Sequence, residues 1–286
     1  KRPSLLTIYK SLIRSHLDYA DIIYDQPHNA SFSQKIESIQ YNAALAITGA
    51  IRGTSREKLY QELGLESLSS RRWLRRLSLF YKLLKNCSPS YMYKIIPTNG
   101  LQRNTRNQFL IPRIFCRTES FSSSFLPYCI KEWNNLNDEI KHSDSLAQFK
   151  RSMLNFIRPV QNSIFDISDS EGVKLLTRLR LGLSHLNKHK FLHGFIDIVN
   201  PMCSCNSEEE CSTHYLLRCP NFFQLRNHLM NKINLINPSL HLLNDDDLSK
   251  ILLFGDSDFD SETNTKILNL TIDFIHKSER FNIQLF

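Results

Sequence analysis

The stretch SSRRWLRRLSLFYKLLKN, residues 69–86, carries the clearest secondary-structure signal of the chain. Its large apolar side chains recur every three or four residues, which places them on one face of an α-helix. These residues are Trp73, Leu77, Phe80, Tyr81 and Leu84. Pro89 follows and ends the helix, because proline lacks the backbone donor that a helix interior needs. A helix with one apolar face needs a packing partner, so the stretch predicts a helical bundle.

Helical spacing continues on both sides of this stretch. It covers residues 5–17, 36–47, 131–140, 146–157, 173–191, 222–233 and 265–277. Residues 97–130 lack this spacing and contain Pro112 and Pro127, so they are predicted as loop with one or two short strands. The predicted fold class is therefore mainly α, with an irregular segment in the middle.

Composition narrows the class of protein. The 286 residues are 41% hydrophobic and carry 36 Lys and Arg against 28 Asp and Glu, a formal net charge of 36 − 28 = +8, which favours a folded chain. With only 8 Gly and no Gly-rich phosphate loop, Walker-type and Rossmann-type nucleotide-binding folds are excluded.

No run of about 18 apolar residues occurs, so we expect an intracellular protein, in the cytoplasm, the nucleus or both, without a membrane partner. Lys1 rather than Met at the start indicates a piece of a longer protein.

Four of the seven cysteines fall within residues 203–219, in CSCNSEEECSTHYLLRCP. Clustering of this kind indicates a metal site in a reducing compartment rather than a disulfide framework. The spacing Cys-x-Cys-x8-His-x4-Cys supplies three thiolates and one imidazole, a closed tetrahedral set for a structural Zn²⁺. The predicted ligands are Cys203, Cys205, His214 and Cys219. Cys211 is a competing ligand, and the alternative is a Cys-rich loop that binds no metal.

Two basic segments predict contacts with nucleic acid, because cations along a helix edge follow a phosphate backbone. No acidic residue lies between Arg71 and Lys85. The predicted contact residues are Arg52, Arg56, Arg71, Arg72, Arg75, Arg76, Lys82, Arg178, Arg180, Lys188 and Lys190. The alternative for both segments is a solvated helix face. The row His185, His189 and His193 has helical spacing but no interleaved carboxylate, so a second metal site there is disfavoured.

Catalytic residues are not found in the sequence. Tyr19, Ala20 and Asp21 superficially resemble a polymerase Tyr-x-Asp-Asp turn, but Ile22 follows and the helical spacing continues, so a helix is predicted there. The acidic run 245–247 is interpreted as a solvated loop rather than a two-metal site.

Six stretches form an ordered set of motifs. They are IYKSLIRSHLDYADIIYD (8–25), KIESIQYNAALAITGA (35–50), LYQELGLESLSSRRWLRRLSLFYKLLKN (59–86), WNNLNDEI with SLAQFK (133–150), LLTRLRLGLSHL (175–186) and CSCNSEEECSTHYLLRCPNF (203–222). In this order they resemble the C-terminal portion of the reverse transcriptases of LINE-type (non-LTR) retrotransposons, over most of residues 1–235.

The resemblance implies a helical thumb-like region after the polymerase palm, then a connector, then a zinc-knuckle-like module that binds element RNA or target DNA. The palm, with its catalytic carboxylates, would precede Lys1, so the isolated chain is expected to be no enzyme and the upstream palm to be a partner. The chain departs from the family pattern at Asn206, where Gly is common, and at Cys211, where Thr is usual.

Five consecutive segments are predicted. They are a thumb-like region (1–95), a connector with short helices (96–158), a linker (159–170), a basic helix with the zinc module (171–235) and an acidic tail with a terminal helix (236–286). The function hypothesis is a non-catalytic, nucleic-acid-binding portion of an RNA-directed DNA polymerase from a transposable element. The alternative is a host-retained helical relic that acts as a protein-interaction module.

Overall fold

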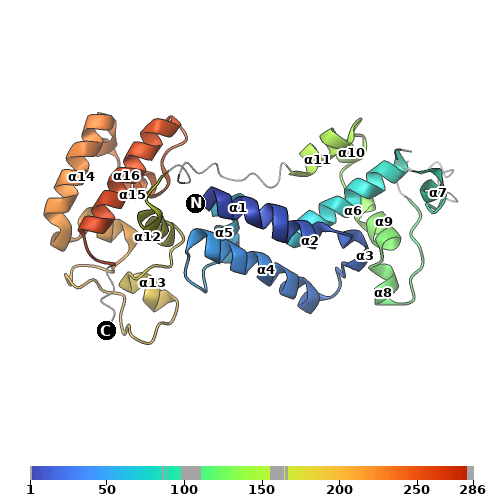
Figure 1. Ribbon diagram of the computed structural model, residues 1–286, viewed down its shortest axis with the longest axis horizontal. Helices are drawn as coiled ribbons and strands as arrows, with labels where there is room; N and C mark the ends of the chain where they lie inside the picture. The colour runs from blue at the N-terminus through green and yellow to red at the C-terminus, as the bar shows by residue number, and fades with distance from the viewer. Residues whose placement is uncertain are drawn as a thin grey trace. The chain divides into compact units, whose positions relative to one another are not determined.

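The structure, a computed structural model, describes residues 2–85, 87, 89–97, 111–154, 164 and 167–281. Helices dominate this part of the chain (Figure 1), which confirms the mainly α class. No strand occurs in the described residues, and an isolated bridge joins Met202 and Glu209. The expectation of strands is therefore wrong for residues 111–130, while residues 98–110 lie outside the described residues.

The chain forms two compact units, and neither is one continuous stretch of sequence. Unit 1 comprises residues 1–7, 43–63 and 160–286, and unit 2 comprises residues 8–42 and 64–159. This division differs from the five consecutive segments expected from the sequence, because residues 43–63 group with the C-terminal half of the chain.

Unit 2 is built around α6 (Leu68–Leu84), the helix that the sequence predicts most strongly. Ser67 begins it as N-cap, since its hydroxyl accepts a hydrogen bond from the Ser70 amide. Leu77, Phe80 and Tyr81 are buried as expected. The other helices that contribute to this unit are η1 (Tyr9–Ile13), α2 (Arg14–Asp18), α3 (Asp21–Tyr24), α4 (Ala30–Thr48), α7 (Ser90–Tyr93), α8 (Glu119–Ser122), α9 (Phe125–Asn135), α10 (Asp138–Lys141) and α11 (Leu146–Leu154).

Aromatic rings from three helices meet in the core of unit 2. Phe149 of α11 stacks on Tyr81 of α6, with ring centroids 4.8 Å apart, and on Trp133 of α9 at 5.9 Å. The single helix predicted over residues 131–140 is instead two, because Leu136 adopts an extended backbone between two asparagines, which have low helix propensity.

Unit 1 contains the helices of the C-terminal half. They are α5 (Arg56–Leu63), α12 (Ser170–Arg180), α13 (Asn187–Leu192), η3 (His214–Arg218), η4 (Pro220–Phe222), α14 (Phe223–Ile236), η5 (Pro238–Leu242), α15 (Asp245–Phe254) and α16 (Ser261–Lys277), with part of α1 (Arg2–Ile8) and of α4. The basic helix predicted over 173–191 is two helices, α12 and α13, because Gly182 at a φ of 71° stops the first. Of the predicted linker, Ile164 is buried, while residues 159–163, 165 and 166 lie outside the described residues.

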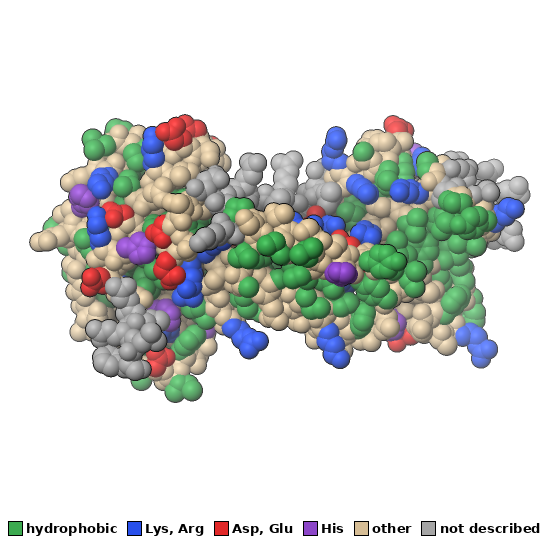
Figure 2. Space-filling model, viewed as in Figure 1, with side chains coloured by type: hydrophobic (Ala, Val, Ile, Leu, Met, Phe, Trp, Pro, Cys, Tyr) green, Lys and Arg blue, Asp and Glu red, His purple; other side chains and the backbone are tan. Residues whose placement is uncertain are grey.

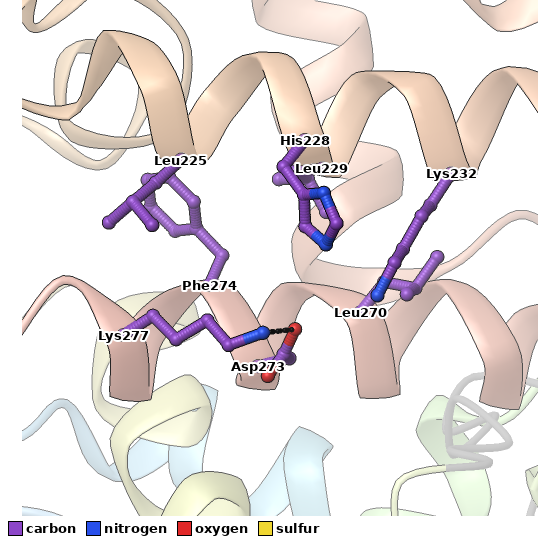
Figure 3. A pocket seen from close by; sticks show the side chains of 8 residues that line it. All are labelled: Leu225, His228, Leu229, Lys232, Leu270, Asp273, Phe274 and Lys277. Atoms are coloured by element: carbon purple, nitrogen blue, oxygen red, sulfur yellow. Dashed lines mark hydrogen bonds and ion pairs between the residues drawn. The ribbon is translucent and has the colours of Figure 1, made fainter.

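The predicted acidic tail is part of the unit 1 core, so the tail interpretation is wrong. The acidic run 245–247 forms the first turn of α15, where carboxylates interact favourably with the positive end of the helix dipole. α16, predicted as a terminal helix, packs along α14 (Figure 3): Leu225 and Leu229 face Leu270 and Phe274. α16 agrees with the helix predicted over 265–277, whereas α15 was not predicted.

Removal of the Phe149 ring tests the unit 2 core. Phe149→Ala is expected to reduce the free energy of unfolding by about 3–5 kcal/mol, because the ring is fully buried between two aromatic neighbours. Both tryptophans, Trp73 and Trp133, lie in unit 2, so tryptophan fluorescence during urea unfolding reports this unit. Phe121→Ala is the control, since Phe121 is 46% exposed and its loss should cost much less. Equal losses in the two variants would contradict the assigned core.

Candidate metal centre and basic surface

The four residues predicted as metal ligands come together in unit 1. The ligand atoms of Cys203, Cys205, His214 and Cys219 all lie within 4.8 Å of one another. The Sγ atoms of Cys203 and Cys219 are 3.7 Å apart, and Cys205 Sγ is 3.3 Å from His214 Nε2. Cys203, His214 and Cys219 are buried, and Cys205 is partly exposed. This cluster could hold a metal ion.

The first two ligands sit on a tight turn. The amide of Asn206 donates to the Cys203 carbonyl at 2.9 Å, and the Cys203 amide donates to the Glu208 carbonyl at 3.0 Å. Asn206 has a φ of 58°, in the left-handed region that Gly and Asn adopt most readily. Asparagine therefore meets the backbone requirement of this turn.

The other two ligands are brought together by a π-helical turn, η3. The amide of Cys219 donates to the carbonyl of His214, five residues earlier, at 2.7 Å. An α-helix repeats after 3.6 residues and would rotate residues five apart away from each other, whereas a π turn brings them closer to one face. The His-x4-Cys spacing thus matches a π turn.

Cys211 is not part of the cluster. Its sulfur accepts a hydrogen bond from the His214 amide at 3.3 Å, as a capping side chain does at the start of a helix. This capping contact gives Cys211 a structural role outside the candidate ligand set.

Two thiols of the cluster, those of Cys205 and Cys219, have strongly displaced pKa values. Burial would raise the pKa of Cys205, but hydrogen bonds from the backbone and side chain of Ser207, followed by those from Cys203 and His214, lower it to about 6. Burial, helped by the charge of Cys203, raises the pKa of Cys219 to about 12. Because thiolates repel one another in a buried site, a cation is needed for all three sulfurs to be ionised together.

An ion pair between the buried Glu210 and the partly exposed Arg280 holds the loop that carries the first two candidate ligands. Arg280, just after α16, binds both carboxylate oxygens of Glu210 at 2.6 Å. The Asn187 amide, at the start of α13, also donates to Glu210, at 2.7 Å. The sequence did not indicate this contact, because Arg280 lies 70 residues from Glu210.

The cationic edge predicted for α6 is not present. Arg72 and Arg76 are only 2% and 1% exposed, and both pair with Asp25, at 2.9 and 3.6 Å. Arg71 pairs with Asp18 at 2.9 Å, and Arg75 pairs with Asp21 at 2.9 Å. The predicted phosphate contacts are therefore wrong for Arg72 and Arg76, which are buried. The side chains of Arg71 and Arg75 are 29% and 40% exposed, and acidic residues from a different segment neutralise them. Lys82, further along α6, is exposed.

An interruption between helices α2 and α3 makes these ion pairs possible. α2 ends at Asp18, Ala20 has a φ of 53°, and α3 begins at Asp21. The prediction of an uninterrupted helix through Tyr19, Ala20 and Asp21 is therefore wrong. The carboxylates at 18, 21 and 25 recur at helical spacing that complements the arginines of α6, a signal the sequence contains.

In unit 1 the predicted cations divide into buried and exposed groups. Arg180 is buried against Glu62, with Nη1 and Oε1 2.8 Å apart, so a phosphate contact by Arg180 is excluded in this fold. Lys188 and Lys190 pair with Glu209 at 2.6 Å and Asp197 at 2.7 Å.

Four further cations of unit 1 form a basic patch, defined here as Arg52, Lys58, Lys174 and Arg178. Arg178 donates to the Gly49 carbonyl at 2.9 Å, which holds the turn bearing Arg52 against α12. Lys174 lies so close to Gly49 that a Cβ there would be 2.6 Å from its Cγ. Arg52 and Lys58 are exposed, as is the nearby Arg56 of α5. Lys174 pairs with Glu171 at 3.2 Å.

The three histidines do not form one face. His185 lies before α13, and His189 is buried, with its Nδ1 2.8 Å from the Ser184 hydroxyl. Burial, with the neighbouring His193 and Lys58, lowers the pKa of His189 to about 4, so its ring is neutral at pH 7.

Comparison of the chain with protein-family models, curated proteins and solved structures gave no match. Within the described residues, no helix combines the length and apolar character that crossing a membrane requires.

The Arg180–Glu62 pair yields a test of which arginines are structural. Arg180→Met is expected to reduce the free energy of unfolding by about 3–5 kcal/mol, because it leaves the buried Glu62 carboxylate without its cation. Arg180→Met combined with Glu62→Leu should recover most of this loss, since no charge then remains buried. Chemical unfolding followed by circular dichroism measures both. A single variant as stable as the parent chain would show that the pair does not constrain unit 1.

Proposed function

We propose that this chain is the non-catalytic, nucleic-acid-binding C-terminal portion of a LINE-type non-LTR retrotransposon reverse transcriptase. One observation carries the proposal: the motif order ends in Cys-x-Cys-x8-His-x4-Cys, and the four side chains converge where the resemblance expects a zinc knuckle. In the parent RNA-directed DNA polymerase, the catalytic carboxylates belong to an upstream palm, which is the proposed protein partner. Element RNA or target DNA is the proposed ligand.

The proposed ion of the cluster is a structural Zn²⁺. Zn–S bonds of about 2.3 Å with tetrahedral angles place two sulfur ligands about 3.8 Å apart. The observed Cys203 to Cys219 distance of 3.7 Å agrees with this value. Three thiolates and one imidazole fill the coordination shell, so the ion's role is to stabilise the fold. Such thiolates persist in a reducing compartment, so the proposed location is the cytoplasm or the nucleus.

The proposed phosphate contacts are those of the basic patch, with Arg56 as a further exposed cation of unit 1. Arg52 and Lys58 project from the turn and from α5, and Arg178 stands beside them on α12. Cations on such a surface attract the phosphate backbone without reading base sequence. Because most predicted arginines of α6 are paired within the fold, the proposal assigns nucleic-acid binding to unit 1.

A second candidate function is a protein-interaction module, and the surface of unit 2 favours it. Over this unit, hydrophobic side chains cover more of the face seen in Figure 2 than Lys and Arg side chains do. Leu12 is 62% exposed, Tyr19 80% and Ile23 85%. Clusters of exposed apolar side chains are typical of protein contact surfaces.

The zinc proposal predicts one ion per chain, lost on removal of a ligand. Cys203→Ser should lose the bound zinc and the order of the loop, because metal binding and folding are coupled in such modules. Cys211→Ser should retain zinc, because Cys211 caps a helix instead of binding the ion. Elemental analysis of the purified chains measures both. Zinc retained by Cys203→Ser and lost by Cys211→Ser would contradict the ligand set.

The nucleic-acid proposal predicts binding that weakens steeply with salt. Replacing Arg52, Lys58 and Arg178 together by Gln should reduce the slope of log affinity against log salt by roughly 2–3, since each lost phosphate contact removes about 0.7–0.9. Titrations of labelled single-stranded RNA and duplex DNA at several salt concentrations measure the slope.

The matched control replaces Lys250, Lys266 and Lys277 by Gln. It removes the same net charge from α15 and α16, where each lysine is exposed and paired with an acidic residue. If the two triple variants bind alike, the basic patch is a solvated face and the protein-interaction function becomes the better explanation.

A further inference from the structure

His214 has one ring nitrogen that the cluster does not use. Nε2 faces Cys205 Sγ at 3.3 Å, so this nitrogen is the one that reaches a metal ion. Nδ1, on the other side of the ring, is buried and has no hydrogen-bond partner. A buried N–H without an acceptor costs about 1–3 kcal/mol, so a nearby acceptor is expected.

Glu208 is placed to be that acceptor. Its Oε1 is 3.6 Å from His214 Nδ1, so closing to hydrogen-bond distance needs a movement of about 1 Å or less. Its backbone carbonyl already accepts the Cys203 amide, so the turn that carries two ligands also holds Glu208 in place. Its Oε2 is 3.4 Å from Arg218, which in turn binds Asp245 at 2.6 Å.

The other two glutamates of the run are engaged elsewhere. Glu209 pairs with Lys188 at 2.6 Å, and Glu210 is bound by Arg280. Of the three consecutive glutamates, Glu208 is therefore the one that faces the histidine ligand.

We infer that Glu208 is a positioning residue for the metal centre: it accepts the proton of His214 Nδ1 in a hydrogen bond and so directs the Nε2 lone pair at the ion. A carboxylate behind a ligating imidazole fixes the tautomer and the ring orientation, and it makes the nitrogen a stronger donor. The inference rests on the proposed metal site, because without an ion the tautomer has no ligand role.

Titration of the full chain with Co²⁺ tests this role. Co²⁺ in a tetrahedral site with thiolate ligands absorbs visible light, so one experiment reports both the ligand set and the affinity. Glu208→Ala is expected to keep the tetrahedral spectrum but lose about 10–100-fold in Co²⁺ affinity, measured by competition with a chelator. Glu208→Gln should recover part of the loss, because its amide oxygen still accepts the hydrogen bond.

Two controls separate positioning from local structure. Glu209→Ala removes an adjacent carboxylate and its ion pair with Lys188, and it should change the affinity less than threefold. Arg218→Gln removes the support of Glu208 while leaving its carboxylate, and it should have a similarly small effect. The His214 Nδ1–H proton should give a slowly exchanging NMR signal in the metal-bound parent chain and in Glu209→Ala, but not in Glu208→Ala.

The outcomes distinguish this inference from the metal site itself. Equal affinities for Glu208→Ala and Glu209→Ala, with a normal Co²⁺ spectrum in the parent chain, would overturn the role of Glu208 and leave the metal site intact. A parent chain that shows no tetrahedral Co²⁺ spectrum would overturn both.

Discussion

Guanidinium groups are costly to remove from water unless a carboxylate accompanies them, and this cost constrains both units of the chain. In unit 2, Arg72 and Arg76 are nearly inaccessible, and both depend on Asp25. In unit 1, Arg180 depends on Glu62, a residue 118 positions earlier in the sequence. Each pair fixes which distant segments pack together, because exchanging the partner segment would leave a charge buried alone.

The Cys/His cluster is subject to the same cost of burying charge, here the negative charge of thiolates. Three sulfur ligands converge in a largely buried site, and the pKa of Cys219 is raised to about 12 by burial. A divalent cation relieves this penalty by ionising the thiols that it binds. The ion pair between Glu210 and Arg280 joins the loop of the first two candidate ligands to the end of α16. Order in the cluster and order at the C-terminal end of unit 1 are therefore linked.

Local features of this chain could be read from the sequence, and features that join distant segments could not. The apolar spacing of residues 69–86 predicted α6 because its signal lies within one helix, and the four ligands were predicted because all lie within 17 residues. Burial of Arg72 depends on its contact with Asp25, 47 residues away in the sequence. Because no local pattern indicates this contact, the arginines of residues 71–76 were predicted to form a free cationic edge. The break at Ala20 was missed because alanine gives no turn signal and rarely adopts the left-handed backbone that it has here.

The net charge of +8 does not show which cations of this chain can reach a phosphate group, because several are paired within the fold. A cation held by a buried carboxylate contributes to folding and is not available to a phosphate group, so Arg72, Arg76 and Arg180 do not count toward an electrostatic surface. Arg52 stands on the exterior, on a turn that Gly49 allows to lie against α12, and Lys58 is exposed on α5. Counterion release depends on the cations that reach phosphates. A few exposed cations should therefore contribute more to binding than a longer run of buried arginines. Affinity for nucleic acid should therefore follow the exposed turn of unit 1 rather than the most arginine-rich helix.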